Sequence, residues 1–428
     1  MTDLAGFPAT ELRFDRKGKR LGSGPVAPPG VTDLIVISHG WHQAGRDARA
    51  MYAALLKQVK TVAAAHGATA GRTFGVAAVY WPSDKFKDDL TLETLPPSSG
   101  PAVSLGSRDL AAAALRDIAR RTATLLDLDP EAFASLAVKA ANGGTDTDVL
   151  LSDLRAALSP ATGSDLTAEH AVLLGNRSGQ AILNAMKTDA ATAAQSAPPP
   201  AADADPARPA VNLLSGARAF IARLLNQAAY YELKARAGTV GEGLARTIDA
   251  DGLPGVQRLH LIGHSFGARL VTAATARLRN IRPYSLTLLQ AAFSHNSFGV
   301  DIGPDRIEGG FRGVVTDRRV TGPIAISHTW NDRAVGVAYA IASVAGGQIA
   351  NALQTSDTFG GAKDIHGGLG ANGALRLKSG EGDHQDFDGQ AVPTLAAGRI
   401  SSRHCDFIPD HGGITGIGTA RLVVGAMS

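Results

Sequence analysis

The fold of this chain is decided by the stretch Arg258-Leu259-His260-Leu261-Ile262-Gly263-His264-Ser265-Phe266-Gly267-Ala268-Arg269-Leu270. Residues 258–263 have the apolar pattern of a buried strand, and residues 267–279 favour a helix. Between them, Gly263-His264-Ser265-Phe266-Gly267 matches G-x-S-x-G. With a strand before it and a helix after it, this pattern holds a serine on a sharp turn, with its Oγ clear of the sheet. We therefore predict that Ser265 is a nucleophile, and that Gly263 and Gly267 let the strand and the helix approach the turn closely.

Apolar segments on both sides of this turn indicate further strands of the same sheet. Leu34-Ile35-Val36-Ile37-Ser38 and residues 74–81 each predict a buried strand, and a helix is expected between them over 47–66. Two more strands are expected at 285–290 and 324–328. Strands that alternate with helices are typical of βαβ units, so the predicted fold class is α/β with a doubly wound, mainly parallel sheet.

The region between the first strands and the serine turn breaks this rhythm. Residues 83–252 are rich in alanine and leucine, with helices expected at 108–126 and 217–236 and a proline-rich loop at 196–209. We interpret this region as a helical insertion, or lid, that helps to cover a site and whose last helix packs on the sheet. Residues 1–82 and 253–428 then form the two parts of the sheet-containing core.

A serine nucleophile also needs amide donors that bind the oxyanion formed during attack. The strand 34–38 ends in His39-Gly40-Trp41, where Gly40 permits a backbone turn that aims an amide inward. We expect the backbone N–H groups of Trp41 and Phe266 to be these donors. His39 is expected to brace the loop through hydrogen bonds.

The serine further needs a base in contact with it and an acid that orients the base. The expected order along the chain is serine, acid, histidine. Asp332 lies just past the end of the strand 324–328, and the carboxyl ends of parallel strands are where such a sheet gathers its chemistry. We predict Asp332 as the acid, with Asp301 and Asp305 as alternatives.

Four histidines follow the predicted acid: His366, His384, His404 and His411. The base must lie on a late loop that reaches back over Ser265. His411 follows Phe407-Ile408-Pro409-Asp410 in a turn just before the last apolar segment. We favour His411 as the base, with His404 as the alternative.

These stretches together resemble the α/β-hydrolase superfamily, and most of all its bacterial and fungal esterase- or lipase-type members. The resemblance rests on His39-Gly40-Trp41, on the G-x-S-x-G turn, on the strand that leads to Asp332, and on Asp410-His411-Gly412. It implies that the catalytic triad lies at the carboxyl edge of the sheet. It also implies hydrolysis through an acyl-enzyme, without a metal or an organic cofactor.

Composition and the remaining motifs exclude several other functions. The formal net charge is only +3, which argues against nucleic acid as a partner. Gly368-Leu369-Gly370-Ala371-Asn372-Gly373 matches G-x-G-x-x-G, but no strand precedes it and no clear helix follows, which argues against a dinucleotide site. His404, Asp406, Asp410 and His411 lie close in sequence without zinc-like spacing, so no metal site is predicted.

The sequence therefore predicts a serine esterase that acts on a small-molecule or lipid ester. Thioester and amide hydrolysis use the same residues and stay open. Two alternatives are a lipase or phospholipase acting at a membrane surface and a non-catalytic binding protein on a hydrolase scaffold. Residues 1–20 contain acids and no apolar run, so we expect no signal peptide in this chain and a cytoplasmic location.

Overall fold

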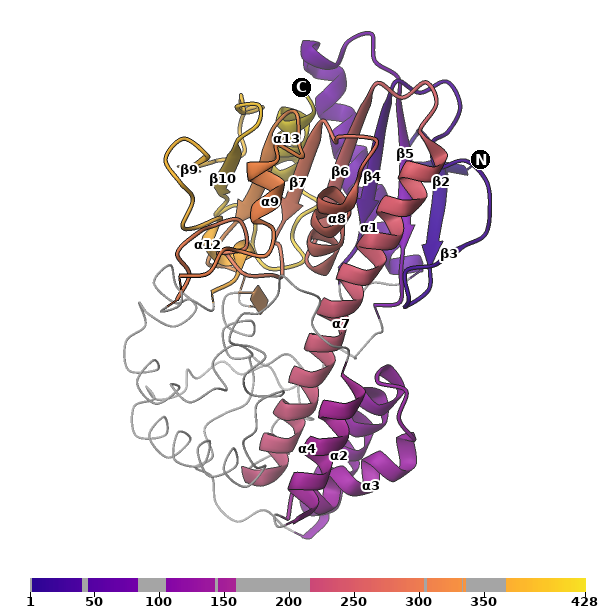
Figure 1. Ribbon diagram of the computed structural model, residues 1–428, viewed down its shortest axis with the longest axis vertical. Coiled ribbons are helices and arrows are strands. Elements are labelled where there is room, and N and C mark those ends of the chain that lie inside the picture. The colour runs from indigo at the N-terminus through magenta and orange to yellow at the C-terminus, as the bar shows by residue number, and fades with distance from the viewer. Residues whose placement is uncertain are drawn as a thin grey trace.

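The protein is built around one mixed, mostly parallel sheet (Figure 1). The computed structural model describes residues 2–40, 45–83, 105–142, 145–158, 216–303, 306–332, 334–335 and 367–428. In this part of the chain ten strands form the sheet, in the order β1-β2-β5-β4-β6-β7-β8-β10-β9, with β3 paired to β2. Only β1 and β3 run antiparallel to their neighbour β2. The strands are β1 (Thr2–Leu4), β2 (Phe7–Phe14), β3 (Arg20–Leu21), β4 (Asp33–Ser38), β5 (Phe74–Tyr80), β6 (Arg258–His264), β7 (Ser285–Leu289), β8 (Ile324–His328), β9 (Gly382–Asp386) and β10 (Ile400–His404).

Helices cover both faces of this sheet, which makes the α/β fold doubly wound. Side chains alternate along a strand, so Leu34 and Val36 of β4 join one core, whereas Ile35 and Ile37 join the other. The first core is closed by α7 and α8, and the second by α1 and α13. The helices are α1 (Arg46–Ala65), α2 (Leu105–Leu125), α3 (Pro130–Ala140), α4 (Thr145–Ala157), α7 (Gly216–Asp251), α8 (Phe266–Arg277), α9 (Arg312–Thr316), α12 (Leu369–Asn372) and α13 (Ile417–Met427), with a 3₁₀ turn at Gly67–Thr69.

A third apolar core lies in the helical region between β5 and β6. Helices α2, α3 and α4 pack together there, away from the sheet (Figure 1). The long helix α7 joins this core to the first one: Ile221 and Leu225 pack among these helices, whereas Leu233 and Val240 pack on the sheet. The expectation that 217–236 simply covers the sheet is therefore wrong for its first half, because that half is buried by α2, α3 and α4.

The expected strands appear close to their predicted positions. The segments predicted at 34–38, 74–81, 285–290 and 324–328 correspond to β4, β5, β7 and β8. The α/β class with a mainly parallel sheet is confirmed. The proline-rich stretch 196–209 lies outside the described residues. In the described part of the chain, no helix is long and apolar enough to cross a membrane.

Candidate active site

Ser265 lies on a strained turn between β6 and α8. Its backbone has φ 56° and ψ −124°, a region that non-glycine residues rarely adopt. Hydrogen bonds hold the turn: Ser265 N donates to Leu289 O over 3.1 Å, and Ser265 O accepts from Ala292 N over 3.2 Å. Strain of this kind persists only where the surroundings fix it, and it concentrates at functional sites.

Three glycines let the neighbouring backbone approach this turn. A Cβ at Gly263 would lie 2.5 Å from Ala268 Cα, and one at Gly267 would lie 2.7 Å from the carbonyl carbon of Ser38. A Cβ at Gly40 would lie 2.9 Å from Ser265 Oγ itself. The loop after β4 therefore passes directly against the serine side chain, and only glycine fits there.

His411 brings an imidazole to the serine from the loop between β10 and α13. Its Nε2 lies 2.8 Å from Ser265 Oγ, within hydrogen-bond distance. His264, the residue before the serine, donates a hydrogen bond from Nε2 to the His411 carbonyl oxygen over 2.8 Å. The two rings lie 4.9 Å apart between centroids. His264 therefore ties the histidine loop to the serine turn, a role that the sequence analysis did not anticipate.

Asp332 completes the chain of hydrogen bonds from the opposite side of the imidazole. It is fully buried in the loop after β8, and its Oδ2 lies 2.8 Å from His411 Nδ1. Its other oxygen, Oδ1, accepts a hydrogen bond from Val335 N over 3.0 Å. Both carboxylate oxygens are thus engaged, which fixes the direction in which the carboxylate faces His411.

Gln290, at the end of β7, holds the same carboxylate. Its side-chain Nε2 donates to Asp332 Oδ2 and to the carbonyl oxygen of Gly370, both over 3.2 Å, and its Oε1 accepts from Ser327 Oγ over 2.8 Å. The residue is fully buried and has a positive φ of 44°. Sequence reasoning missed this role. The available signal was a polar residue that ends an apolar strand at the edge where the site lies.

The electrostatics of the site raise the pKa of His411 above its ordinary value of 6.5. Burial opposes the charged imidazolium, but the charge of Asp332 and its hydrogen bond outweigh this effect, with a smaller contribution from Asp410. Burial beside His411 instead lowers the pKa of His264 to about 3. At neutral pH, His264 is therefore an uncharged hydrogen-bond donor.

His39 occupies the end of β4 as a buried, neutral side chain. Its Nδ1 donates to the carbonyl oxygen of Gly40 over 3.0 Å, and its Nε2 accepts from Trp81 N over 3.4 Å. Its ring stacks on the Trp81 indole with an interplanar angle of 12°. Burial lowers the pKa of His39 to about 4. These contacts hold the loop that carries Gly40 against Ser265.

Of the two expected oxyanion donors, Phe266 lies among the described residues and Trp41 does not. Phe266 is the first residue of α8, directly after Ser265, and its ring packs on Tyr230 with 4.8 Å between centroids. Its amide therefore lies at the positive end of the helix dipole. Trp41 lies outside the described residues.

The other acids and histidines considered as site residues either form contacts away from Ser265 or lie outside the described residues. Asp301 forms an exposed ion pair with Arg306, while Asp305 and His366 lie outside the described residues. His384 donates to the carbonyl oxygen of Ala374, and His404 lies 3.1 Å from Asp386 on β9. The described residues contain no group of histidines, cysteines and carboxylates that could hold a metal ion.

Comparison with known proteins gives no match: no family model, no curated protein and no solved structure matches this chain. The chemistry open to the site follows from its own geometry. That geometry joins a serine on a strained turn, an imidazole and a buried carboxylate by hydrogen bonds of 2.8 Å.

Proposed function

We propose that the protein is a serine hydrolase with the α/β-hydrolase fold, which cleaves carboxylic esters through an acyl-enzyme. The observation that carries the proposal is the chain of hydrogen bonds from Asp332 through His411 to Ser265. This arrangement supplies a nucleophile, its general base and the group that orients the base. The order of the three residues along the chain and the serine turn between strand and helix support the fold assignment.

The first half of the proposed reaction forms the acyl-enzyme. His411 Nε2 accepts the proton of Ser265 while Oγ attacks the carbonyl carbon of the ester. Asp332 accepts a hydrogen bond from His411 Nδ1, which keeps the correct tautomer and stabilises the imidazolium that forms. The Phe266 amide, together with the Trp41 amide expected from the sequence, binds the oxyanion. The tetrahedral intermediate then expels the alkoxide, which takes its proton from His411.

The second half returns the enzyme to its starting state. A water molecule gives a proton to His411 Nε2 and attacks the acyl carbon. The new tetrahedral intermediate breaks the bond to Ser265 Oγ, and the proton returns from His411 to the serine. The products are a carboxylic acid and the alcohol, with no change in oxidation state.

A panel of p-nitrophenyl esters of graded acyl length tests the proposal. We expect turnover by the wild type on at least one ester and none above background for Ser265→Ala. An emulsified long-chain triglyceride in the same panel examines the lipase alternative. Absence of turnover on every ester by folded wild-type protein would count against the proposed function.

The raised pKa of His411 sets the expected pH dependence. Only the neutral imidazole accepts a proton, so kcat/KM should rise with pH as His411 loses its proton, with a midpoint above 6.5. Asp332→Asn removes the two largest interactions that raise this pKa and leaves burial and the smaller effect of Asp410. Its midpoint should therefore lie at a lower pH than that of the wild type. The measurements are pH–rate profiles of both proteins, and an unchanged midpoint in Asp332→Asn would contradict the assignment.

Gln290 is expected to act as a positioning residue for Asp332. Gln290→Leu removes a donor to the carboxylate and should lower kcat about 10- to 100-fold while KM stays the same. The matched control is Thr287→Val on the same strand, which removes a buried hydroxyl that has no hydrogen-bond partner in the described structure. Steady-state kinetics on both variants, corrected for the folded fraction, make the comparison. Equal kcat values in Gln290→Leu and Thr287→Val would show that Gln290 has only a structural role.

A further inference from the structure

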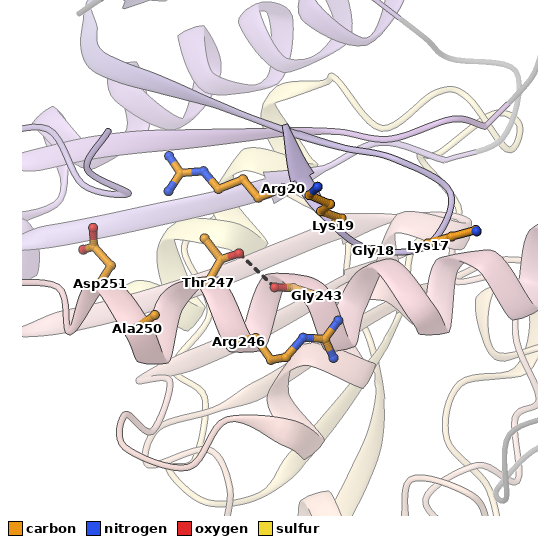
Figure 2. A pocket seen from close by; sticks show the side chains of 9 residues that line it. All are labelled: Lys17, Gly18, Lys19, Arg20, Gly243, Arg246, Thr247, Ala250 and Asp251. Atoms are coloured by element: carbon orange, nitrogen blue, oxygen red, sulfur yellow. Dashed lines mark hydrogen bonds between the residues drawn. The ribbon is translucent and has the colours of Figure 1, made fainter. Parts of the chain in front are cut away.

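A basic cavity lies far along helix α7 from the serine. It has a volume of about 570 Å³ and is formed between the β2–β3 turn and the last turns of α7 (Figure 2). Four cationic side chains line it: Lys17 and Lys19 from the turn, Arg20 from the start of β3, and Arg246 from the helix. Two segments more than 200 residues apart in sequence thus contribute to one charged cavity.

The two backbone segments that form this cavity lie close together. Gly18 has a φ of +70°, and a Cβ at Gly243 would lie 2.7 Å from the carbonyl carbon of Gly18. The turn is further fixed by Asp15, whose Oδ1 accepts hydrogen bonds from the amides of Lys17 and Lys19, each over 2.9 Å. The backbone that carries the cationic side chains is therefore fixed on both walls.

The positive charge of this cavity is only partly compensated within the described structure. None of the four cations has an ion-pair partner among the described residues. The one carboxylate in the lining, Asp251, accepts hydrogen bonds from the amides of Val26 and Leu253. The cavity therefore concentrates positive charge in a chain whose formal net charge is only +3. Bringing like charges together costs free energy that a bound anion offsets.

We propose that this cavity binds a phosphate-bearing anion. The guanidinium groups of Arg20 and Arg246 match phosphate oxygens with paired N–H donors, and the two lysines add compact charges. The charged ends of these side chains point in different directions (Figure 2), so a ligand with several negative charges reaches more of them than a single carboxylate does. The ligand is either a free phosphate compound or a phospholipid headgroup, which share this chemistry.

The proposed anion site is separate from the site of ester cleavage. Tyr230 of α7 packs on Phe266 beside the serine, whereas the cavity begins at Gly243, 13 positions further along the same helix. At 1.5 Å per residue this places the two regions about 20 Å apart. The inference thus goes beyond the proposed hydrolase activity and does not depend on it.

Calorimetric titration with inorganic pyrophosphate at low ionic strength tests the proposal. The test variant is Arg20→Gln/Arg246→Gln, and the matched control is Lys57→Gln/Arg282→Gln, which removes the same charge from exposed sites elsewhere. We expect saturable binding to the wild type and the control, weakened about tenfold or more in the test variant. Equal thermal unfolding of the two variants without ligand shows that the fold is retained.

A parallel experiment distinguishes the two sources of phosphate. It measures co-sedimentation with phosphatidylcholine vesicles with and without phosphatidic acid. Vesicle binding that requires phosphatidic acid and is lost in the test variant, without pyrophosphate binding, assigns a lipid headgroup. Pyrophosphate binding lost in the test variant assigns a free phosphate compound. Binding that is equal in the test and control variants, or absent with both probes, would overturn the proposal.

Discussion

Replacement of His411 by alanine is expected to lower kcat for ester hydrolysis by about 10⁴- to 10⁶-fold. In the proposed mechanism the imidazole accepts the serine proton, and a hydroxyl without a base is a poor nucleophile. The substitution keeps the backbone carbonyl that accepts a hydrogen bond from His264, so the loop retains that contact. KM should change little, because the loss concerns the transition state. The measurement is steady-state hydrolysis of the best ester of the panel.

Two further variants show whether the three residues act as a unit. Asp332→Asn should lower kcat by about 10⁴-fold, and adding it to His411→Ala should cause little further loss. His404→Ala is the matched control, because His404 lies at the end of β10 against Asp386. If His404→Ala lost as much activity as His411→Ala, the assignment of the base would be wrong.

The second large effect is expected on stability, at Gly267. A Cβ there would overlap the carbonyl groups of Ser38 and His39, which are buried backbone and not the ends of flexible side chains. We expect Gly267→Ala to lower the free energy of unfolding by about 3 kcal/mol or more, or to prevent soluble folding. The control is Gly416→Ala, where a Cβ meets nothing and φ is −75°. Urea denaturation of both variants gives the comparison, and equal midpoints would contradict the close approach of β4 to the serine turn.

The central strands could be predicted because they are buried on both faces. All six residues of β4 are buried, and the apolar run 34–37 within it is typical of parallel sheets. The strand β9, Gly382–Asp386, was not anticipated, since it is a polar edge strand with one neighbour and three exposed residues. Its sequence has no apolar period, and it is held in the sheet by its parallel pairing with β10.

Helix α7 shows why helix boundaries are harder to derive. The sequence predicted its end at residue 236, whereas the helix continues to Asp251. The added segment contains Gly238, Gly241 and Gly243, and glycine lowers helix propensity by about 1 kcal/mol per residue. Packing of Val240 and Leu244 on the sheet core compensates for this low propensity, and packing is not visible in local sequence.

The sequence was most informative where the chemistry of a residue and its expected place in the fold indicate the same role. Each of three residues, Ser265, Asp332 and His411, follows the carboxyl end of a parallel strand. The structure brings these residues together at that edge of the sheet. Gln290 and His264 were not anticipated, because their roles depend on partners about 40 and 150 positions away. Such partners become evident only once the strand order is known.

The most direct test of the central claim is reaction of the folded protein with a fluorophosphonate, followed by intact-mass and peptide mass spectrometry. This reagent forms a covalent bond with an activated serine hydroxyl. We predict one adduct per chain, located on Ser265, absent in Ser265→Ala and strongly slowed in His411→Ala. An unlabelled wild-type protein, or an adduct that persists in Ser265→Ala, would contradict a nucleophilic role for Ser265.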